Sequence, residues 1–269
     1  MMVALVVAGV IGIALTRLVV SQSRFVALQD GLMRARAGAR AGFNVALSEL
    51  RSVTFGGLIT AKADTVEARV PLAFGVACGQ PSGGQQAILL LPYDSATLAA
   101  ATVDGFAWRD AAGAWQFISP ASVTSMSASS SYCTSTSYAD PAISRPTGWR
   151  IITVSPNDVD TEVGTTVYLY HTVRYRLGPS AQLSGRRALW RLAGGTEEEL
   201  AVPFDTSSHF SFLVGSRLTP QATAPAALDS VRGLRLKLVG QSEESPEGRS
   251  RPASFTMTTD IVFINRVTR

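Results

Sequence analysis

The sequence predicts an α+β protein in which one long N-terminal helix packs against a mostly antiparallel β-sheet head. Residues 1–16 form an uncharged apolar run, and apolar or small residues then recur with a helical period near 3.6 up to Arg51. Farther along the chain, several short segments alternate apolar and polar residues, as strands with one buried face do. We therefore divide the chain into an N-terminal helix, residues 1–52, and a β-rich head, residues 53–269.

The predicted helix begins with a segment suited to a membrane. Residues 1–16, extended by residues 18–20, are a little short of the ~20 apolar residues that span a bilayer. No Lys or Arg precedes the run and no small-x-small cleavage pattern follows it, so the pattern does not indicate a secretory signal. One continuous helix of roughly 50 residues would extend about 75 Å. It would be apolar on all sides at its start and amphipathic afterwards.

A set of apolar and small residues is expected to anchor this helix or to pack it against other helices. The set comprises Val3, Leu5, Val7, Gly9, Gly12, Leu15, Phe25, Leu28, Leu32, Gly38 and Gly42. Gly38 and Gly42 are spaced as G-x-x-x-G, which lets neighbouring helices approach closely. In the alternative interpretation the glycines are only tolerated there, each destabilising the helix by about 1 kcal/mol relative to alanine.

The charge balance and composition of the chain do not indicate a nucleic-acid-binding protein. The 269 residues include 24 Lys and Arg against 20 Asp and Glu, and only Lys62 and Lys237 are lysines. The excess of arginine lies in the helix, where it could bind lipid headgroups or acidic neighbouring chains, or could reflect genome composition. We expect no nucleic-acid partner, because no basic stripe interleaved with aromatic residues is present.

The cysteines and histidines give no metal site. Cys78 and Cys133 are the two cysteines, and His171 and His209 lack the spacing of zinc ligands. In an oxidising compartment a disulfide between Cys78 and Cys133 is the simplest expectation, and closing a loop of that length stabilises a fold by about 4 kcal/mol. Two buried free thiols are the alternative.

The head is expected to be an antiparallel meander. The clearest strand is 167–177, and 106–109 with 115–118 reads as a hairpin around residues 110–113. Residues 119–138 are rich in serine and threonine and are expected to form a loop or an edge strand. Further strands are predicted at 66–72, 86–91, 149–154, 187–192, 200–204, 210–214, 231–239 and 255–264.

Two acidic segments each leave two interpretations. Residues 158–162 resemble a calcium loop only in part, because the glycine and the terminal glutamate are not at EF-hand positions, and an ordinary polar turn is the simpler interpretation. Residues 197–199 are three consecutive glutamates, which form either a solvated turn or a contact for another subunit's arginines.

Two parts of the chain resemble a known family. Residues 1–12, Met-Met-Val-Ala-Leu-Val-Val-Ala-Gly-Val-Ile-Gly, resemble the hydrophobic segment of type IV prepilins, which follows a Gly-Phe-Thr-Leu-x-Glu processing motif in that family. The motif is absent, so we expect that the natural protein begins upstream, with a basic leader and a few mature residues before Met1. The succession of strands from Val167 to Arg266 is similar to that of PilW-like minor pilins and J-type pseudopilins.

This resemblance implies a type IV pilin-like fold and a structural role. In the family, the helix holds the subunit in the bacterial inner membrane by a single pass, with the head in the periplasm or outside the cytoplasm. It then packs beside the helices of other minor and major pilins or pseudopilins. The chain would initiate or cap a type IV pilus or a type II secretion pseudopilus.

The sequence contains no signature of catalysis. It has no nucleophile elbow, Walker loop, His-Glu-x-x-His or dinucleotide fingerprint. We therefore expect no enzyme activity, no cofactor and no small-molecule substrate. The alternative function is a membrane-anchored adhesive or substrate-binding β domain that does not polymerise.

Overall fold

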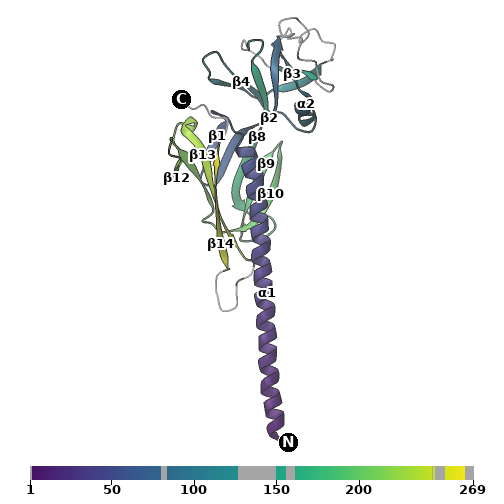
Figure 1. The fold of residues 1–269 in the computed structure, drawn as a ribbon, viewed down its shortest axis with the longest axis vertical. Helices are drawn as coiled ribbons and strands as arrows, with labels where there is room; N and C mark the ends of the chain where they lie inside the picture. The colour runs from purple at the N-terminus through teal and green to yellow at the C-terminus, as the bar shows by residue number, and fades with distance from the viewer. Residues whose placement is uncertain are drawn as a thin grey trace.

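The structure is a computed structural model that describes residues 2–79, 84–126, 150–155, 161–243, 245 and 252–263. A single helix, α1 (Met2–Leu50), projects from a head built mainly of antiparallel strands (Figure 1). The prediction of an α+β protein with one long N-terminal helix is confirmed.

The described strands of the head form one antiparallel sheet. The strand order along it is β12-β11-β13-β10-β9-β8-β2-β3-β7-β6, with β1, β4, β5 and β14 attached beside this path. Its strands are β1 (Leu58–Lys62), β2 (Thr65–Gly79), β3 (Gln86–Leu90), β4 (Gly105–Arg109), β5 (Trp115–Ile118), β6 (Ser122–Met126), β7 (Arg150–Ser155), β8 (Thr166–Pro179), β9 (Arg187–Ala193), β10 (Thr196–Phe204), β11 (His209–Val214), β12 (Thr219–Gln221), β13 (Val231–Gln241) and β14 (Ser254–Val262).

Among the described residues, the head has two main hydrophobic cores, and we call the parts of the head around them the helix-bearing lobe and the distal lobe. In the helix-bearing lobe, residues 39–50 of α1 supply side chains to a core that they share with β9 to β11, β13 and β14. In the distal lobe, β3, β4 and β7 enclose a separate core around Ile88, Phe106 and Trp108. The distal lobe lies at the end of the head farthest from the N-terminus of α1 (Figure 1).

The two longest strands, β2 and β8, join the lobes. They pair antiparallel from Thr65 opposite Arg176 to Val76 opposite Thr166, with one irregularity between Pro71 and Ala73. Each strand therefore contributes residues to both cores: Val70 of β2 belongs to the helix-bearing core and Ala73 to the distal core. The predicted strand 167–177 is confirmed as the centre of β8.

A short helix, α2 (Pro92–Ala99), was not predicted from the sequence. It begins with Pro92 in its first turn. Proline is well tolerated there, because the N–H that it lacks would have no partner within the helix. Asp94, also in the first turn, accepts a hydrogen bond from the backbone N–H of Phe74 at 2.8 Å. The carboxylate thus fixes α2 to β2.

The serine-rich segment is a strand at its start. Residues 122–126, predicted to lie in a loop or an edge strand, form β6, which pairs with β7 through five residue pairs at the end of the sheet. Period-two alternation is weak there because threonine and serine occupy both faces. Residues 127–138 lie outside the described part of the chain.

We predict that Ile88→Ala lowers the free energy of unfolding by about 2–5 kcal/mol, because Ile88 is fully buried in the distal core. The matched control is Val76→Ala on the neighbouring strand β2, whose side chain is 37% exposed. The control should change stability by less than about 1 kcal/mol. Denaturant titrations of the full chain in detergent measure both values, and equal losses would contradict the two-core description.

Candidate functional site

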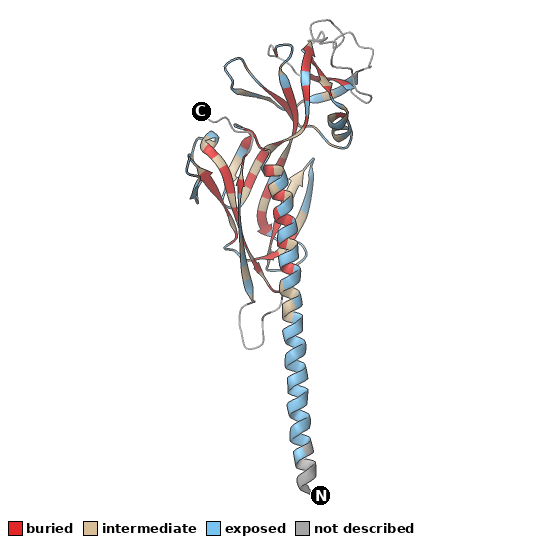
Figure 2. Cartoon of the chain, viewed as in Figure 1, coloured by how far each residue is buried: buried red, intermediate tan, exposed pale blue. Residues whose placement is uncertain are grey.

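The candidate functional site is the free half of α1 together with the contacts that fix α1 in the head. Every described side chain from Val7 to Ala27 is exposed, as the pale blue part of the helix in Figure 2 shows. The large apolar residues among them are Val7, Val10, Ile11, Ile13, Leu15, Leu18, Val19, Val20, Phe25 and Val26. Burial of so many exposed apolar side chains away from water is favourable, so this part of the helix is suited to apolar surroundings.

By length and composition, α1 could span a membrane. Within the described residues it is the one helix that meets this criterion, and the apolar window within it is not buried in the head. Arg17 and Arg24 are the charged residues of the exposed segment before Asp30. Both lie on the head side of the uncharged run of residues 1–16, where long arginine side chains reach polar surroundings while their stems stay in apolar ones.

The second half of α1 is embedded in the head. Its side chains become partly buried at Leu28 and fully buried in a stripe that repeats every three to four residues. The buried residues are Ala35, Ala39, Gly42, Phe43, Ala46 and Leu50. Most of them are small, which lets the helix axis lie close to the sheet, where it contacts β10, β13 and β14.

The predicted anchor and assembly residues fall into two groups. Val7, Gly9, Gly12, Leu15 and Phe25 are exposed on the free half of α1. Leu28, Leu32 and Gly38 are partly buried near the place where the helix enters the head, and Gly42 is buried there. The side chains of Val3 and Leu5 lie outside the described part of the chain.

The structure corrects the interpretation of Gly42. A Cβ at this position would lie 3.2 Å from Cβ of Ala201 and 3.3 Å from Cδ2 of Leu189, so the missing side chain lets α1 approach β9 and β10 of its own head. A Cβ at Gly38 would meet nothing within 4 Å. The G-x-x-x-G pair therefore does not form one face for another helix, because one of its glycines already serves an internal contact.

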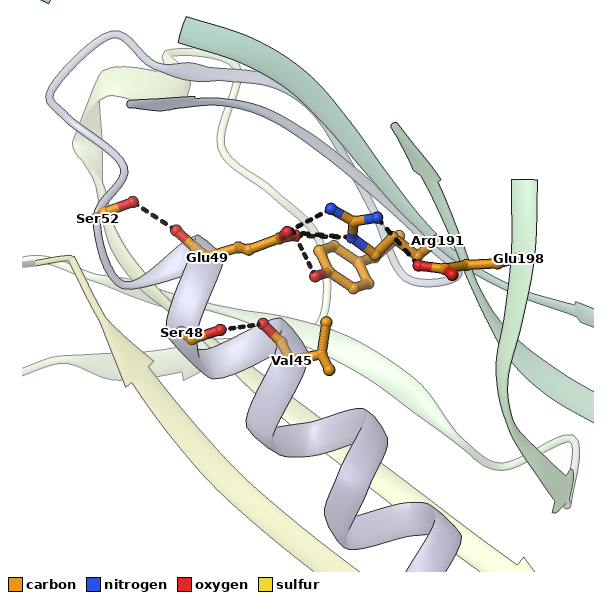
Figure 3. Close-up of polar contacts among 7 residues, drawn as sticks. Val45, Ser48, Glu49, Ser52, Arg191 and Glu198 are labelled. Atoms are coloured by element: carbon orange, nitrogen blue, oxygen red, sulfur yellow. Dashed lines mark hydrogen bonds and ion pairs between the residues drawn. The ribbon is translucent and has the colours of Figure 1, made fainter. Parts of the chain in front are cut away.

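Glu49 in the last turn of α1 is the main polar link between helix and head. Nε of Arg191 on β9 donates to both carboxylate oxygens of Glu49 at 3.1 Å, and the arginine Nη2 donates to Oε1 as well. The hydroxyl of Tyr175 on β8 donates to Oε2. Arg191 also binds Glu198 of β10, with 3.0 Å between Nη1 and Oε1 (Figure 3). The helix end is thereby linked to three neighbouring strands.

The electrostatics of this link favour the charged form of Arg191 and the protonated form of Tyr175. Hydrogen bonding to Glu49, opposed by burial, raises the pKa of Arg191. Burial and the adjacent Glu49 carboxylate raise the pKa of Tyr175, so its hydroxyl stays protonated and can donate. The side chains of Glu49 and Arg191 are only 18% and 20% exposed, so water screens their attraction less than it screens a surface pair.

A second contact fixes the chain to the head just after the end of α1. Thr54, which is buried, and Tyr168 on β8 share a hydrogen bond of 2.6 Å between their hydroxyl oxygens. The rings of Trp115 and Phe74 pack against Tyr168, with centroids 5.0 and 5.9 Å away. Burial raises the pKa of Tyr168 to about 12. The aromatic group thus connects the end of α1 with the distal lobe.

The three consecutive glutamates bind within their own head. They lie at the start of β10: Glu197 pairs with Arg176 at 2.7 Å, Glu198 with Arg191, and Glu199 accepts a hydrogen bond from Ser180 at 2.7 Å. The interpretation as a turn is therefore wrong, because the three residues lie in a strand, although Glu197 and Glu198 are exposed to solvent. A contact with another subunit's arginines stays a prediction. The hairpin signal of residues 194–195 could have indicated the pairing, because it places Glu198 opposite Arg191.

The remaining predicted site residues are only partly described. Cys78 at the end of β2 is disulfide-bonded, but Cys133 lies outside the described residues, so pairing of Cys78 with Cys133 stays a prediction. Asp158 and Asp160 of the partial calcium motif also lie outside them.

We predict that Arg191→Gln lowers the free energy of unfolding by about 1.5–3 kcal/mol, because it leaves the half-buried Glu49 carboxylate without its charged partner. The matched control is Arg235→Gln, which breaks an exposed ion pair with Asp260 on β14 and should leave stability almost unchanged. Denaturant titrations of both variants decide the point. An equal effect of the two substitutions would show that the Glu49 link does not hold the helix.

We predict that acid weakens the fold through His171 on β8. Burial lowers the pKa of His171 from its ordinary value of 6.5; the Glu49 carboxylate opposes this shift and Arg191 adds to it. Below pH 6.5 the unfolded chain therefore binds a proton that the folded chain does not, so the free energy of unfolding falls until the pH passes the lower folded pKa.

The variant His171→Gln should lose less stability than the unmodified chain between about pH 7.5 and about pH 5.5. Urea titrations at several pH values measure the difference. Parallel pH profiles for the two proteins would rule out a contribution from His171.

Neither a metal-binding cluster among the described residues nor a similarity to known proteins indicates a function for this site. Within the described residues, no group of three or more His, Cys, Asp or Glu side chains is placed to hold a metal ion. The chain matches no family model, no curated protein and no solved structure.

Proposed function

We propose that this chain is a structural subunit of the type IV pilin class, a minor pilin or pseudopilin that initiates or caps a filament. The observation that carries the proposal is the division of α1 into two halves. One half is built into the core of the head, and the other is an exposed apolar rod in direct continuation of it. In this proposal the fold is pilin-like, with α1 as its assembly helix and no catalytic role.

The first role of the free half is to anchor the subunit. Residues 1–16, extended by residues 18–20, come close to the ~20 apolar residues that span the hydrocarbon core, and Arg17 and Arg24 then lie toward the head-side interface. The proposed localisation is the bacterial inner membrane, crossed once, with the head in the periplasm. A backbone that is helical throughout satisfies its own hydrogen bonds in lipid.

The second role is to pack against other pilin or pseudopilin helices. Moving the free half from lipid into a bundle of apolar helices keeps its side chains away from water, so association depends on close packing. A Cβ at Gly9, Gly12, Gly31 or Gly38 would meet nothing within 4 Å in the isolated chain. These glycines give neighbouring helices room to approach.

The head favours a minor subunit at the end of a filament. The distal lobe extends beyond the C-terminal end of α1, away from the free half of the helix (Figure 1). A lobe in this position has space at a tip, where no further subunit stacks above it. The Glu49 and Thr54 links would transmit a pull on α1 to this lobe.

A second candidate function is a membrane-anchored binding domain that does not polymerise. It is favoured by apolar side chains exposed on the distal lobe: Phe74 and Val76 of β2, together with Leu91 and Tyr93 at the start of α2. Tyr93 is 82% exposed. This domain would use the same anchor, so the two functions differ in whether the free half of α1 contacts other helices.

We predict that Gly38→Leu leaves the head folded and the protein in the membrane fraction but reduces filament assembly by about tenfold, equivalent to 1.4 kcal/mol of lost packing. Sheared filament yield and electron microscopy in the native host measure assembly. Gly42→Leu is the contrasting variant. It should destabilise the head itself by about 1–3 kcal/mol, because Ala201 and Leu189 occupy the space.

If Gly38→Leu assembles as well as the unmodified chain, close packing at this glycine is not needed and the binding-domain function is favoured. If no filament depends on the gene at all, while the protein stays in the membrane, the pilin proposal fails and the anchor remains.

A further inference from the structure

Strand β14 is an open edge of the sheet. It pairs with β13 through nine consecutive residue pairs, from Val262 opposite Gly233 to Ser254 opposite Gln241. No described strand pairs with its other side. In Figure 1, β14 runs beside α1, with which it is in contact.

Hydrogen bonds at both ends of β14 fix which backbone groups face outward. The N–H of Phe263 donates to the carbonyl of Arg232 at 3.1 Å, and the N–H of Ser242 donates to the carbonyl of Ala253 at 2.8 Å. In an antiparallel pair such residues alternate with residues whose N–H and C=O point away from the partner. The outward-facing residues are Ser254, Thr256, Thr258, Asp260 and Val262.

This edge lacks most of the usual features that prevent another strand from pairing. Proteins protect edges with proline, lysine, bulges or short strands. Two other described edge strands have such features: β12 is three residues long and contains Pro220, and β1 has an irregular register and ends in Lys62. β14 has no proline, glycine or lysine and keeps its register throughout. The charge of Asp260 is compensated by Arg235, with 2.7 Å between Nε and Oδ1.

The neighbouring face of α1 defines the chemistry of a strand that would pair there. The guanidinium of Arg36 lies over the ring of Phe255 on β14, 5.5 Å from the ring centroid. Arg40 is one helical turn farther on, and both arginines are exposed. Neither forms an ion pair with any described residue. A strand added about 4.8 Å from β14 would place alternate side chains beside these two charges.

We propose that β14 is a docking site for an extended acidic segment of a partner protein, which joins the sheet as an additional strand. Backbone groups of Thr256 and Thr258 would form the new ladder, and Arg36 and Arg40 would bind carboxylates on alternate residues of the segment. The proposal depends only on the head and the embedded half of α1. It therefore stands whether or not the free half of α1 assembles into filaments.

The test uses the full chain in detergent and a synthetic peptide as long as β14, in which threonine alternates with valine and glutamate. A second peptide carries lysine in place of glutamate. Amide hydrogen exchange should slow by about tenfold or more at Thr256 and Thr258 with the acidic peptide. The lysine peptide should bind about tenfold more weakly, and Arg36→Gln should reduce the difference between the peptides.

Two variants separate docking from folding. Thr258→Pro removes one outward-facing N–H, and a proline is tolerated at an edge where its N–H would face solvent, so the head should stay folded and peptide binding should be lost. Thr258→Val keeps the N–H and should keep binding.

Three results would overturn the proposal. The first is that the acidic peptide does not slow exchange at Thr256 and Thr258, and the second is that Thr258→Pro binds the peptide as well as the unmodified chain does. The third is that these amides are already protected without peptide in a concentration-dependent way, because the edge would then pair with a second copy of the chain.

Discussion

The two halves of α1 require different surroundings, the head for one and apolar surroundings for the other, and the rest of the structure depends on this constraint. From Leu28 onward α1 buries a narrow stripe of mostly small residues against the head, whereas its free half exposes large apolar side chains on every side. The embedded half needs the sheet of the head, against which it packs. The free half needs lipid or other helices. Because the helix is continuous, whatever surrounds the free half also determines the position of the head.

The head is built so that this helix cannot easily rotate or slide. Apolar packing of Phe43 and Leu50 gives the contact area, but apolar packing alone has little directional preference. The charged hydrogen bonds of Glu49 supply direction, since Arg191 and Tyr175 approach its carboxylate from two different strands. Tyr168, bound to Thr54, extends the same connection along β8 into the distal lobe. The open edge of β14 involves none of these residues, so partner binding there would leave these links intact.

Much of the fold could be predicted from the sequence, but some elements could not, and the physical reason differs from one element to the next. The helix and strand 167–177 have long, clear periods, so their existence follows from patterning alone. Helix α2 is too short for its period to be seen, and β6 has serine and threonine on both faces. Gly42 was assigned to a contact between helices because spacing identifies a close approach but not its partner. The Glu49 link joins residues more than a hundred positions apart, which no local pattern can indicate. The pairing of Glu198 with Arg191 is the exception, since a hairpin brings them opposite one another.

The most direct measurement is the accessibility of single cysteines introduced into the full chain in intact spheroplasts, probed with a membrane-impermeant maleimide. Val10→Cys reports on the free half of α1, and Thr196→Cys reports on the exposed hairpin between β9 and β10. The account predicts that the cysteine at position 196 reacts rapidly, while the one at position 10 reacts only after detergent is added. Rapid reaction at position 10 without detergent would mean that the apolar half of α1 is not in the membrane, and would contradict the account.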